Sequence, residues 1–380
     1  MSASTISRLV GSSRYQAISD DALKDEDNVA WVMQLAPEIR QEWVERIRWI
    51  RLVDRLAEQE LLVSGQFGFR QFHQEWEALF NTGKANPGRY HDILTRMGEL
   101  WLEPDKIPNA CPLMQAWDLY VQSAVYYHNP NLAIDTLDQY TTMLNELGGS
   151  FFQVFPFLPP QYREAASAFG AMDQFYNNLR DLKEDAARGI CYFPRDVLKE
   201  FGLTPRDILR GDVCDRPAYR AMMQFWLQRY LPILRQRAQK LLVAQDLHPS
   251  WRILREWSLH RYRRIEWVFQ TCNYDYVKFA EFYWPEVQKE LLVLIAWVRQ
   301  VQTGPESVGQ FSQSPPQEAF TMLSMVSTLT SRLYSGAKPR VSQNYTHPGV
   351  TQGYYKPSGP QGAHQVSGVQ GAHLKEAYCT

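Results

Sequence analysis

The chain has 380 residues, 45% hydrophobic and 21% charged, the ordinary balance of a globular protein with a sizeable core. Its formal net charge of −1 lacks the basic excess typical of nucleic-acid-binding proteins, so we expect no nucleic-acid partner. The five cysteines form no CxxC pair, which argues against a structural zinc site or a thioredoxin-like motif.

Neither a signal peptide nor a membrane span is predicted. The N-terminal stretch MSASTISRLVGSSRYQ has no apolar core, and the longest apolar run, residues 291–298, is far too short to cross a bilayer. The sparse cysteines fit a reducing compartment. We therefore expect a cytoplasmic protein whose membrane contact, if it has any, is peripheral.

From residue 26 to residue 302 the sequence has the pattern of consecutive amphipathic helices. Apolar residues recur three and four positions apart, as in Trp43, Ile47 and Ile50, and runs of alternating β-branched residues are missing. The pattern predicts one large all-α domain of roughly ten helices. The polar residues 1–25 are expected to form a flexible arm.

After residue 302 the composition changes. Residues 303–335 are expected to form a linker with a short amphipathic helix at 320–334, which would dock on its own domain or lie on a membrane surface. Residues 336–380 contain too few apolar side chains to offset the entropy of ordering, so we expect a disordered tail.

The first candidate site lies in a strongly apolar stretch. On a helix, Asp54 and Glu58 share one face because they are four residues apart, and Arg51 lies about one turn before Asp54. A charged pair with such apolar neighbours is hard to explain as a solvated surface. It indicates a polar site bordered by apolar walls.

A second acidic row follows in the middle of the chain. Asn177, Asp181 and Asp185 repeat every four residues, and Glu184 lies beside Asp181 on the same helical face. Carboxylates gathered in this way repel one another unless a cation lies between them. Mg²⁺ accepts such oxygen ligands and completes its shell with water and substrate phosphate.

Arg180 and Arg188 alternate with these carboxylates and could neutralise part of the charge on a diphosphate. The same mixture of charges is also typical of a solvated helix face, so the second row by itself leaves both interpretations open. The basic stretch at residues 260–264, HRYRR, is interpreted as a solvated face or an ion-pair site.

The motifs together resemble a known family. The run from Asn177 to Asp196, with residues 201–208 after it, strongly resembles the second aspartate-rich region of the squalene and phytoene synthase family. Residues 51–58 resemble the first aspartate-rich helix, and Tyr140 stands where the family has a tyrosine ahead of a helix of small residues. The resemblance covers about residues 27–300.

The resemblance implies a single all-α domain of the isoprenoid synthase type with a central cavity. It implies that two allylic prenyl diphosphates are joined head to head, with Mg²⁺ as cofactor and with NADPH only if squalene is formed. Tyr140 would stabilise the carbocation or transfer a proton, and Asn177 would assist metal binding. The implied metal ligands are Asp54, Glu58, Asp181, Glu184 and Asp185, and the implied phosphate contacts are Arg51, Arg180 and Arg188.

The chain departs from the family pattern at several positions, which keeps alternatives open. Arg55 replaces a second aspartate of the phytoene-type first motif, and Asn28 stands in a pair where the family has Ser-Phe. Asn145 and Glu146 replace two small residues after Tyr140. One alternative is a degenerate member that binds a prenyl diphosphate or lipid without coupling, and another is a helical scaffold with charged surface rows. The oligomeric state and the choice between C15 and C20 substrates are left open.

Overall fold

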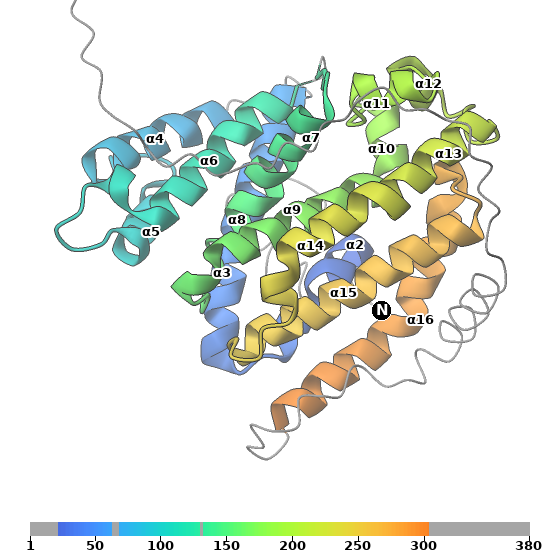
Figure 1. Cartoon of the computed structure of the whole chain (residues 1–380). Coiled ribbons are helices and arrows are strands. Elements are labelled where there is room, and N and C mark those ends of the chain that lie inside the picture. Colours follow the sequence, from blue (N-terminus) through green and yellow to red (C-terminus); the bar gives the residue numbers. More distant parts are fainter. Residues whose placement is uncertain (1–21, 63–67, 130–131, 304–380) are drawn as a thin grey trace, which may run out of the picture. The chain divides into compact units, whose positions relative to one another are not determined.

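The computed structural model describes residues 22–62, 68–129 and 132–303 (Figure 1). The predicted linker, the 320–334 helix and the 336–380 tail lie outside the described residues, as does most of the predicted arm. Helix α2 begins at Ala22, so regular structure starts before the expected boundary at residue 26.

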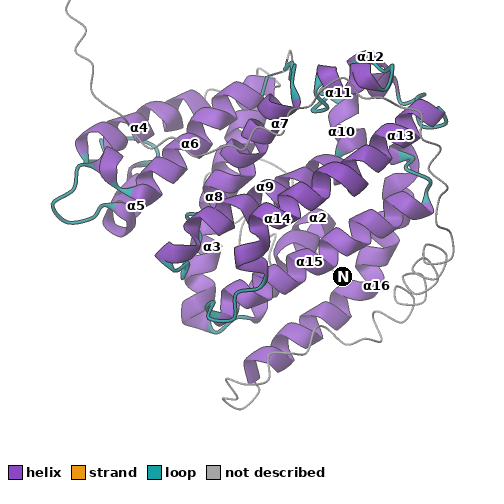
Figure 2. Ribbon diagram, in the orientation of Figure 1, coloured by secondary structure: helices purple, strands orange, loops and turns teal. Residues whose placement is uncertain are grey.

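The described residues are helical and contain no strand, which confirms the all-α class (Figure 2). The central cavity implied by the resemblance stays a prediction. Within the described part of the chain, no helix is both long enough and apolar enough to span a bilayer. The longer helices are α3 (Pro37–Ala57), α4 (Phe69–Thr82), α5 (His91–Trp101), α6 (Pro112–Tyr127), α9 (Arg163–Arg180), α14 (Leu231–Leu242), α15 (Pro249–Thr271) and α16 (Tyr276–Thr303).

Short helices connect these long ones. They are α2 (Ala22–Val29), α7 (Leu137–Leu144), α8 (Ser150–Phe152), α10 (Leu182–Ala187), α11 (Arg195–Glu200), α12 (Pro205–Arg210) and α13 (Pro217–Phe225). Three wider π-helical turns, η2 (Glu58–Leu62), η4 (Asn145–Gly149) and η6 (Trp226–Tyr230), interrupt the helical runs, and 3-10 turns lie at η1 (Ala30–Gln34), η3 (Pro108–Ala110) and η5 (Pro160–Tyr162).

Local sequence signals explain several helix ends. Helix α7 begins with a capping box, in which the Thr136 side chain accepts from the Gln139 backbone and the Gln139 side chain accepts from the Thr136 backbone. Helix α12 has the same device at Thr204 and Asp207. Helix α12 ends at Arg210. The next residue, Gly211, caps it with a φ of 74°, in the left-handed region that glycine adopts without strain.

Two hydrophobic cores support the structure. The larger one surrounds α9, which packs against α14 and against the π turn η4. Close packing at the second contact depends on glycine, because a Cβ added to Gly148 would clash with the carbonyl oxygen of Gly170. The smaller core lies between the end of α3 and helices α4, α5 and α6. The acidic end of α3 therefore belongs to one core and the acidic end of α9 to the other.

Candidate functional site

The second acidic row forms at the junction between α9 and α10. Asp181 ends α9 and precedes α10, yet helical hydrogen bonding continues through it. The Asp181 backbone N–H donates to Asn177 O over 2.9 Å, and the Asp185 N–H donates to Asp181 O over 2.9 Å. The expected spacing of Asn177, Asp181 and Asp185 along one helical path is thus confirmed.

Two cations already contact Asp181. Arg180 holds both carboxylate oxygens, with Nε–Oδ1 at 2.8 Å and Nη2–Oδ2 at 2.9 Å. Lys24 Nζ lies 2.8 Å from Asp181 Oδ2 and 3.4 Å from Glu184 Oε2. Burial opposes ionisation of Asp181, but these cations, Arg180 foremost, lower its pKa to about 2.

Asp185 has the opposite setting. It is buried, and loss of solvation followed by the neighbouring charge of Asp181 raises its pKa to about 8, although Lys24 and Arg188 act against the shift. A carboxyl group with this pKa carries little charge at pH 7 in the metal-free protein. A divalent cation placed at this row would lower that pKa and recover the charge.

Asn177 provides the structural test of whether a metal fits. Its amide Nδ2 donates to Asp173 Oδ2 over 3.1 Å. Its Oδ1 is buried and has no hydrogen-bond partner. A buried oxygen left unpaired costs free energy unless a ligand satisfies it. Oxygen is the ligand atom that Mg²⁺ prefers, so Asn177, Asp181 and Asp185 fit that ion.

The first acidic row lies where α3 passes into the π turn η2. Half of the Asp54 side-chain surface (52%) is open, and its Oδ1 lies 3.4 Å from His128 Nε2. The other ring nitrogen, His128 Nδ1, contacts Ala124 O at 3.0 Å. Loss of solvation opposes ionisation of Asp54, but His128 and then Arg51 and Lys24 keep its pKa below the usual value.

No pattern in the sequence pointed to His128. It is a lone histidine at the end of α6, and its role follows only from the packing of α6 against α3. Asp54 combines an open surface with a marked loss of solvation.

The two acidic rows lie opposite each other. Arg188, just after α10, donates from Nη1 to Glu58 Oε1 over 3.0 Å. Burial and the charge of Asp54 raise the pKa of Glu58, which Arg188 partly offsets. Lys24 also lies close enough to influence both Asp54 and Asp185. Two helices from distant parts of the sequence thus meet through this ion pair, and the metal and phosphate roles of their residues stay predictions.

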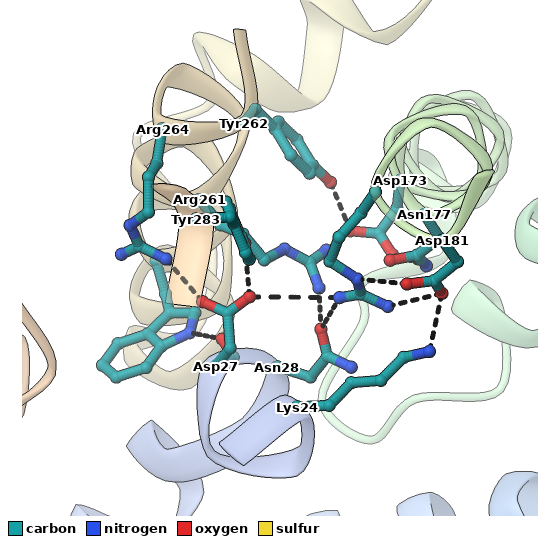
Figure 3. A network of polar contacts seen from close by, with 12 residues as sticks. Lys24, Asp27, Asn28, Asp173, Asn177, Asp181, Arg261, Tyr262, Arg264 and Tyr283 are labelled. Carbon is teal, nitrogen blue, oxygen red and sulfur yellow. Dashed lines mark hydrogen bonds and ion pairs between the residues drawn. The ribbon is translucent and has the colours of Figure 1, made fainter. Parts of the chain in front are cut away.

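A buried polar network supports the second row (Figure 3). Asp27, on α2, accepts from Arg264 Nη1 over 2.6 Å and from Tyr283 Oη over 2.5 Å. Its neighbour Asn28 accepts through Oδ1 from Arg180 Nη1 over 2.9 Å and from Arg261.

Arg261 also pairs with Asp173, to which Tyr262 donates over 2.5 Å. Arg261 and Arg264 are buried in ion pairs, which confirms the ion-pair interpretation for these two residues, whereas Arg263 is exposed. Sequence reasoning also missed Lys24 and Asp27. The sequence pattern that could have identified them is their spacing with Asn28, which puts all three residues on one face of a short helix.

Tyr140 and the two altered positions after it have partners in neighbouring helices. Tyr140 is buried against the ring of Trp226, with centroids 5.3 Å apart, and its hydroxyl accepts from Asn178 Nδ2 over 3.3 Å. Glu146 Oε2 accepts from the Tyr127 hydroxyl over 2.8 Å. Asn145 donates through Nδ2 to the helix backbone over 2.6 Å and accepts through Oδ1 from α14 over 2.9 Å.

Among the described residues, no group of three or more His, Cys, Asp or Glu side chains is arranged to hold a metal ion by itself. The rows therefore do not form a closed protein cage.

The chain is similar to known proteins in both sequence and fold. The family model for squalene/phytoene synthase matches residues 23–266. The 15-cis-phytoene synthase of Synechococcus elongatus is 37% identical over 122 residues, which cover 32% of this chain and 37% of that protein. Phytoene synthase 2 of Oryza sativa is 36% identical over 136 residues, covering 36% of this chain and 32% of that protein. These matches span only about a third of the curated relatives' length.

Solved structures show the same fold. A dehydrosqualene synthase crystallised with a ligand superposes with a TM-score of 0.52 at 14% identity, over 70% of this chain and 92% of that one. The squalene synthase HpnC from Alicyclobacillus acidocaldarius gives a TM-score of 0.51 at 15% identity, over 70% of this chain and 99% of that one. At this identity the likeness establishes the fold alone.

Proposed function

Since the chain belongs to the squalene/phytoene synthase family, we propose that it is a Mg²⁺-dependent prenyltransferase that condenses two allylic prenyl diphosphates head to head. The observation that carries the proposal is the meeting of the two acidic rows through Arg188 and Glu58, 3.0 Å apart. A scaffold with charged surface rows has no need to bring them together, and so that alternative loses its support.

Each part of the site has a task in this reaction. When bound with the diphosphates, Mg²⁺ would neutralise the negative charge that develops as a diphosphate leaves. Asp54 and Glu58 on one side, and Asp181, Glu184 and Asp185 on the other, would hold the ion from facing helices, with Asn177 Oδ1 as a further ligand. Arg51 and Arg188 would contact phosphate oxygens, since each lies at the edge of a row.

The structure suggests a different task for Arg180. The sequence suggested a phosphate contact, but its Nε and Nη2 hold Asp181 and its Nη1 reaches Asn28. The guanidinium is buried, so we propose that Arg180 fixes the orientation of Asp181. Tyr140, packed against Trp226, belongs to an aromatic region suited to stabilising an allylic cation through ring faces.

The proposal is tested by supplying farnesyl or geranylgeranyl diphosphate with Mg²⁺ and identifying the extracted hydrocarbon. We expect coupled product from the wild-type protein and its loss in Asp54→Asn and Asp181→Asn. Asp135→Asn is the matched control, because that exposed carboxylate pairs with Arg195 away from the rows. Product that persists in both row variants would refute the proposal.

The same assay also tests the alternative of a degenerate family member that binds the diphosphate without coupling. The replacement of a motif aspartate by Arg55 keeps that alternative open. Tight, Mg²⁺-dependent binding of the diphosphate without product would identify a binding protein. A need for NADPH would mark a squalene-type product. Because the prenyl chains of these substrates are hydrophobic, we also propose that the protein makes peripheral contact with membranes. Flotation of the protein with liposomes tests this proposal.

A further inference from the structure

Helix α2 places a lysine against the second acidic row. Lys24 Nζ lies 2.8 Å from Asp181 Oδ2 and 3.4 Å from Glu184 Oε2. Only 25% of its side-chain surface is exposed. Its positive charge also lowers the pKa of Asp54, which belongs to the opposite row. The ammonium group thus contacts carboxylates of the second row and acts on the first row only through its charge.

This position is fixed by the way α2 is anchored. Lys24, Asp27 and Asn28 share one face of the helix, and Figure 3 shows all three directed toward the α9 and α15 side chains. Asp27 is held by Arg264 and Tyr283, and the Trp257 indole N–H donates to the Asp27 carbonyl oxygen over 2.7 Å. Because these contacts hold α2 in place, the position of Lys24 beside the carboxylates is determined by the fold.

Lys24 also contacts Asp181 Oδ2, an oxygen that would be a ligand of a metal bound to the second row. Arg180 occupies both oxygens of Asp181 from one side, and Lys24 contacts Oδ2 from another. Asn177 Oδ1, one helical turn earlier, remains unsatisfied. An ammonium group and a divalent cation cannot share the same carboxylate edge at short range, because like charges at a few ångströms repel strongly.

We propose that Lys24 is a built-in counter-ion that occupies the metal-binding edge of the second acidic row and must be displaced before a divalent cation can bind there. This inference rests on the proposed function, because it takes the row as the metal site. Lys24 would keep the carboxylates close together without metal, and would leave Asp181 Oδ2 when a metal–diphosphate complex arrives.

The test measures metal binding without substrate. Mn²⁺ serves as the probe, because the electron paramagnetic resonance signal of the free ion reports the unbound fraction directly. Lys24→Met should bind Mn²⁺ about tenfold more tightly than the wild type, since a competing positive charge is removed. Lys24→Arg, which keeps the charge, should bind like the wild type.

Lys278→Met is the matched control, because Lys278 forms a comparable ion pair with Asp275 at 3.2 Å away from the site. Circular dichroism and thermal unfolding confirm that each variant is folded. If Lys24→Met binds Mn²⁺ no more tightly than the wild type, including the case in which neither binds, the inference is overturned. The proposed function fails separately, by absence of coupled product.

Discussion

Arg188 Nη1 donates to Glu58 Oε1 over 3.0 Å, although the two residues are 130 positions apart in the sequence. The pair joins the end of α10 to the π turn after α3. It therefore crosses from one acidic row to the other and defines the width of the polar site. Because the side chains are 53% and 35% exposed, solvent weakens the pair, and its role lies in the site more than in stability.

The first prediction follows from that exposure. Arg188→Gln should change the free energy of unfolding by less than about 0.5 kcal/mol, as is usual for exposed ion pairs. If the proposed function holds, it should lower kcat/KM about tenfold or more, because Arg188 would then stabilise the leaving diphosphate. Arg195→Gln removes a similar exposed 3.0 Å pair with Asp135 and should leave kcat/KM unchanged. Equal effects of the two variants would contradict the assignment.

The second prediction concerns Asp185 and pH. Its pKa rises from 3.8 to about 8 on folding, so between these values the folded protein holds a proton that the unfolded chain has lost. Stability of the metal-free protein must therefore fall as pH rises from about 4 to about 8. Asp185→Asn should remove this part of the pH dependence.

At pH 8, Asp185→Asn should also stabilise the metal-free protein by more than about 1 kcal/mol, since each pKa unit corresponds to about 1.4 kcal/mol. Denaturant unfolding at several pH values measures both effects. Asp135→Asn, on the exposed surface, should change neither. A loss of stability in Asp185→Asn would show that burial of the ionised Asp185 carboxylate does not destabilise the metal-free protein.

The sequence predicted the parts of the site that depend on helical spacing. Asn177, Asp181 and Asp185 follow one helical path, and Asp54 with Glu58 closes the site from the other side, because a four-residue repeat determines which side chains share a face. The all-α fold was likewise predictable, since the apolar period is local. What joins these rows could not be derived from spacing alone.

Contacts between distant helices depend on tertiary packing instead. His128 meets Asp54 only because α6 packs on α3, and Lys24 reaches Asp181 only because Asp27 anchors α2. The basic residues 260–264 were interpreted in part as a solvated face because buried arginines are rare. Arg261 and Arg264 are buried here because Asp173 and Asp27, far away in sequence, supply the carboxylates.

The third prediction concerns His128. Its positive charge helps to keep the pKa of Asp54 low, so His128→Gln should raise that pKa. The acidic limb of the pH profile of kcat/KM should then move to higher pH. His73→Gln is the control, because His73 pairs with Glu77 at 3.8 Å on α4. A profile that does not move would show that Asp54 ionises independently of His128.

The fourth prediction concerns the contact between η4 and α9. Gly148→Ala would force a methyl group against the Gly170 carbonyl, and backbone cannot give way as a flexible side chain does. We expect a loss of roughly 2 kcal/mol or more in unfolding free energy. At Gly98 the nearest atoms are 3.4 and 3.5 Å away, so Gly98→Ala in α5 should be neutral or stabilising. Urea denaturation compares the two, and similar stabilities would argue against the close approach.

The last prediction concerns Asn177, whose Oδ1 is buried without a partner. If this oxygen is a metal ligand, Asn177→Ala should weaken Mn²⁺ binding about tenfold, as measured by the resonance of the free ion. It should barely change the stability of the metal-free protein. The lost hydrogen bond to Asp173 costs about 1 kcal/mol, and removal of an unsatisfied buried oxygen offsets it.

Asn145→Ala is the control for Asn177→Ala, because it makes the same change at an amide held by α7 and α14, and it should leave Mn²⁺ affinity unchanged. The combination of weaker binding and preserved stability separates a ligand from a structural residue. A structural role would reverse that pattern, because the protein would lose stability while each folded molecule kept its affinity for Mn²⁺.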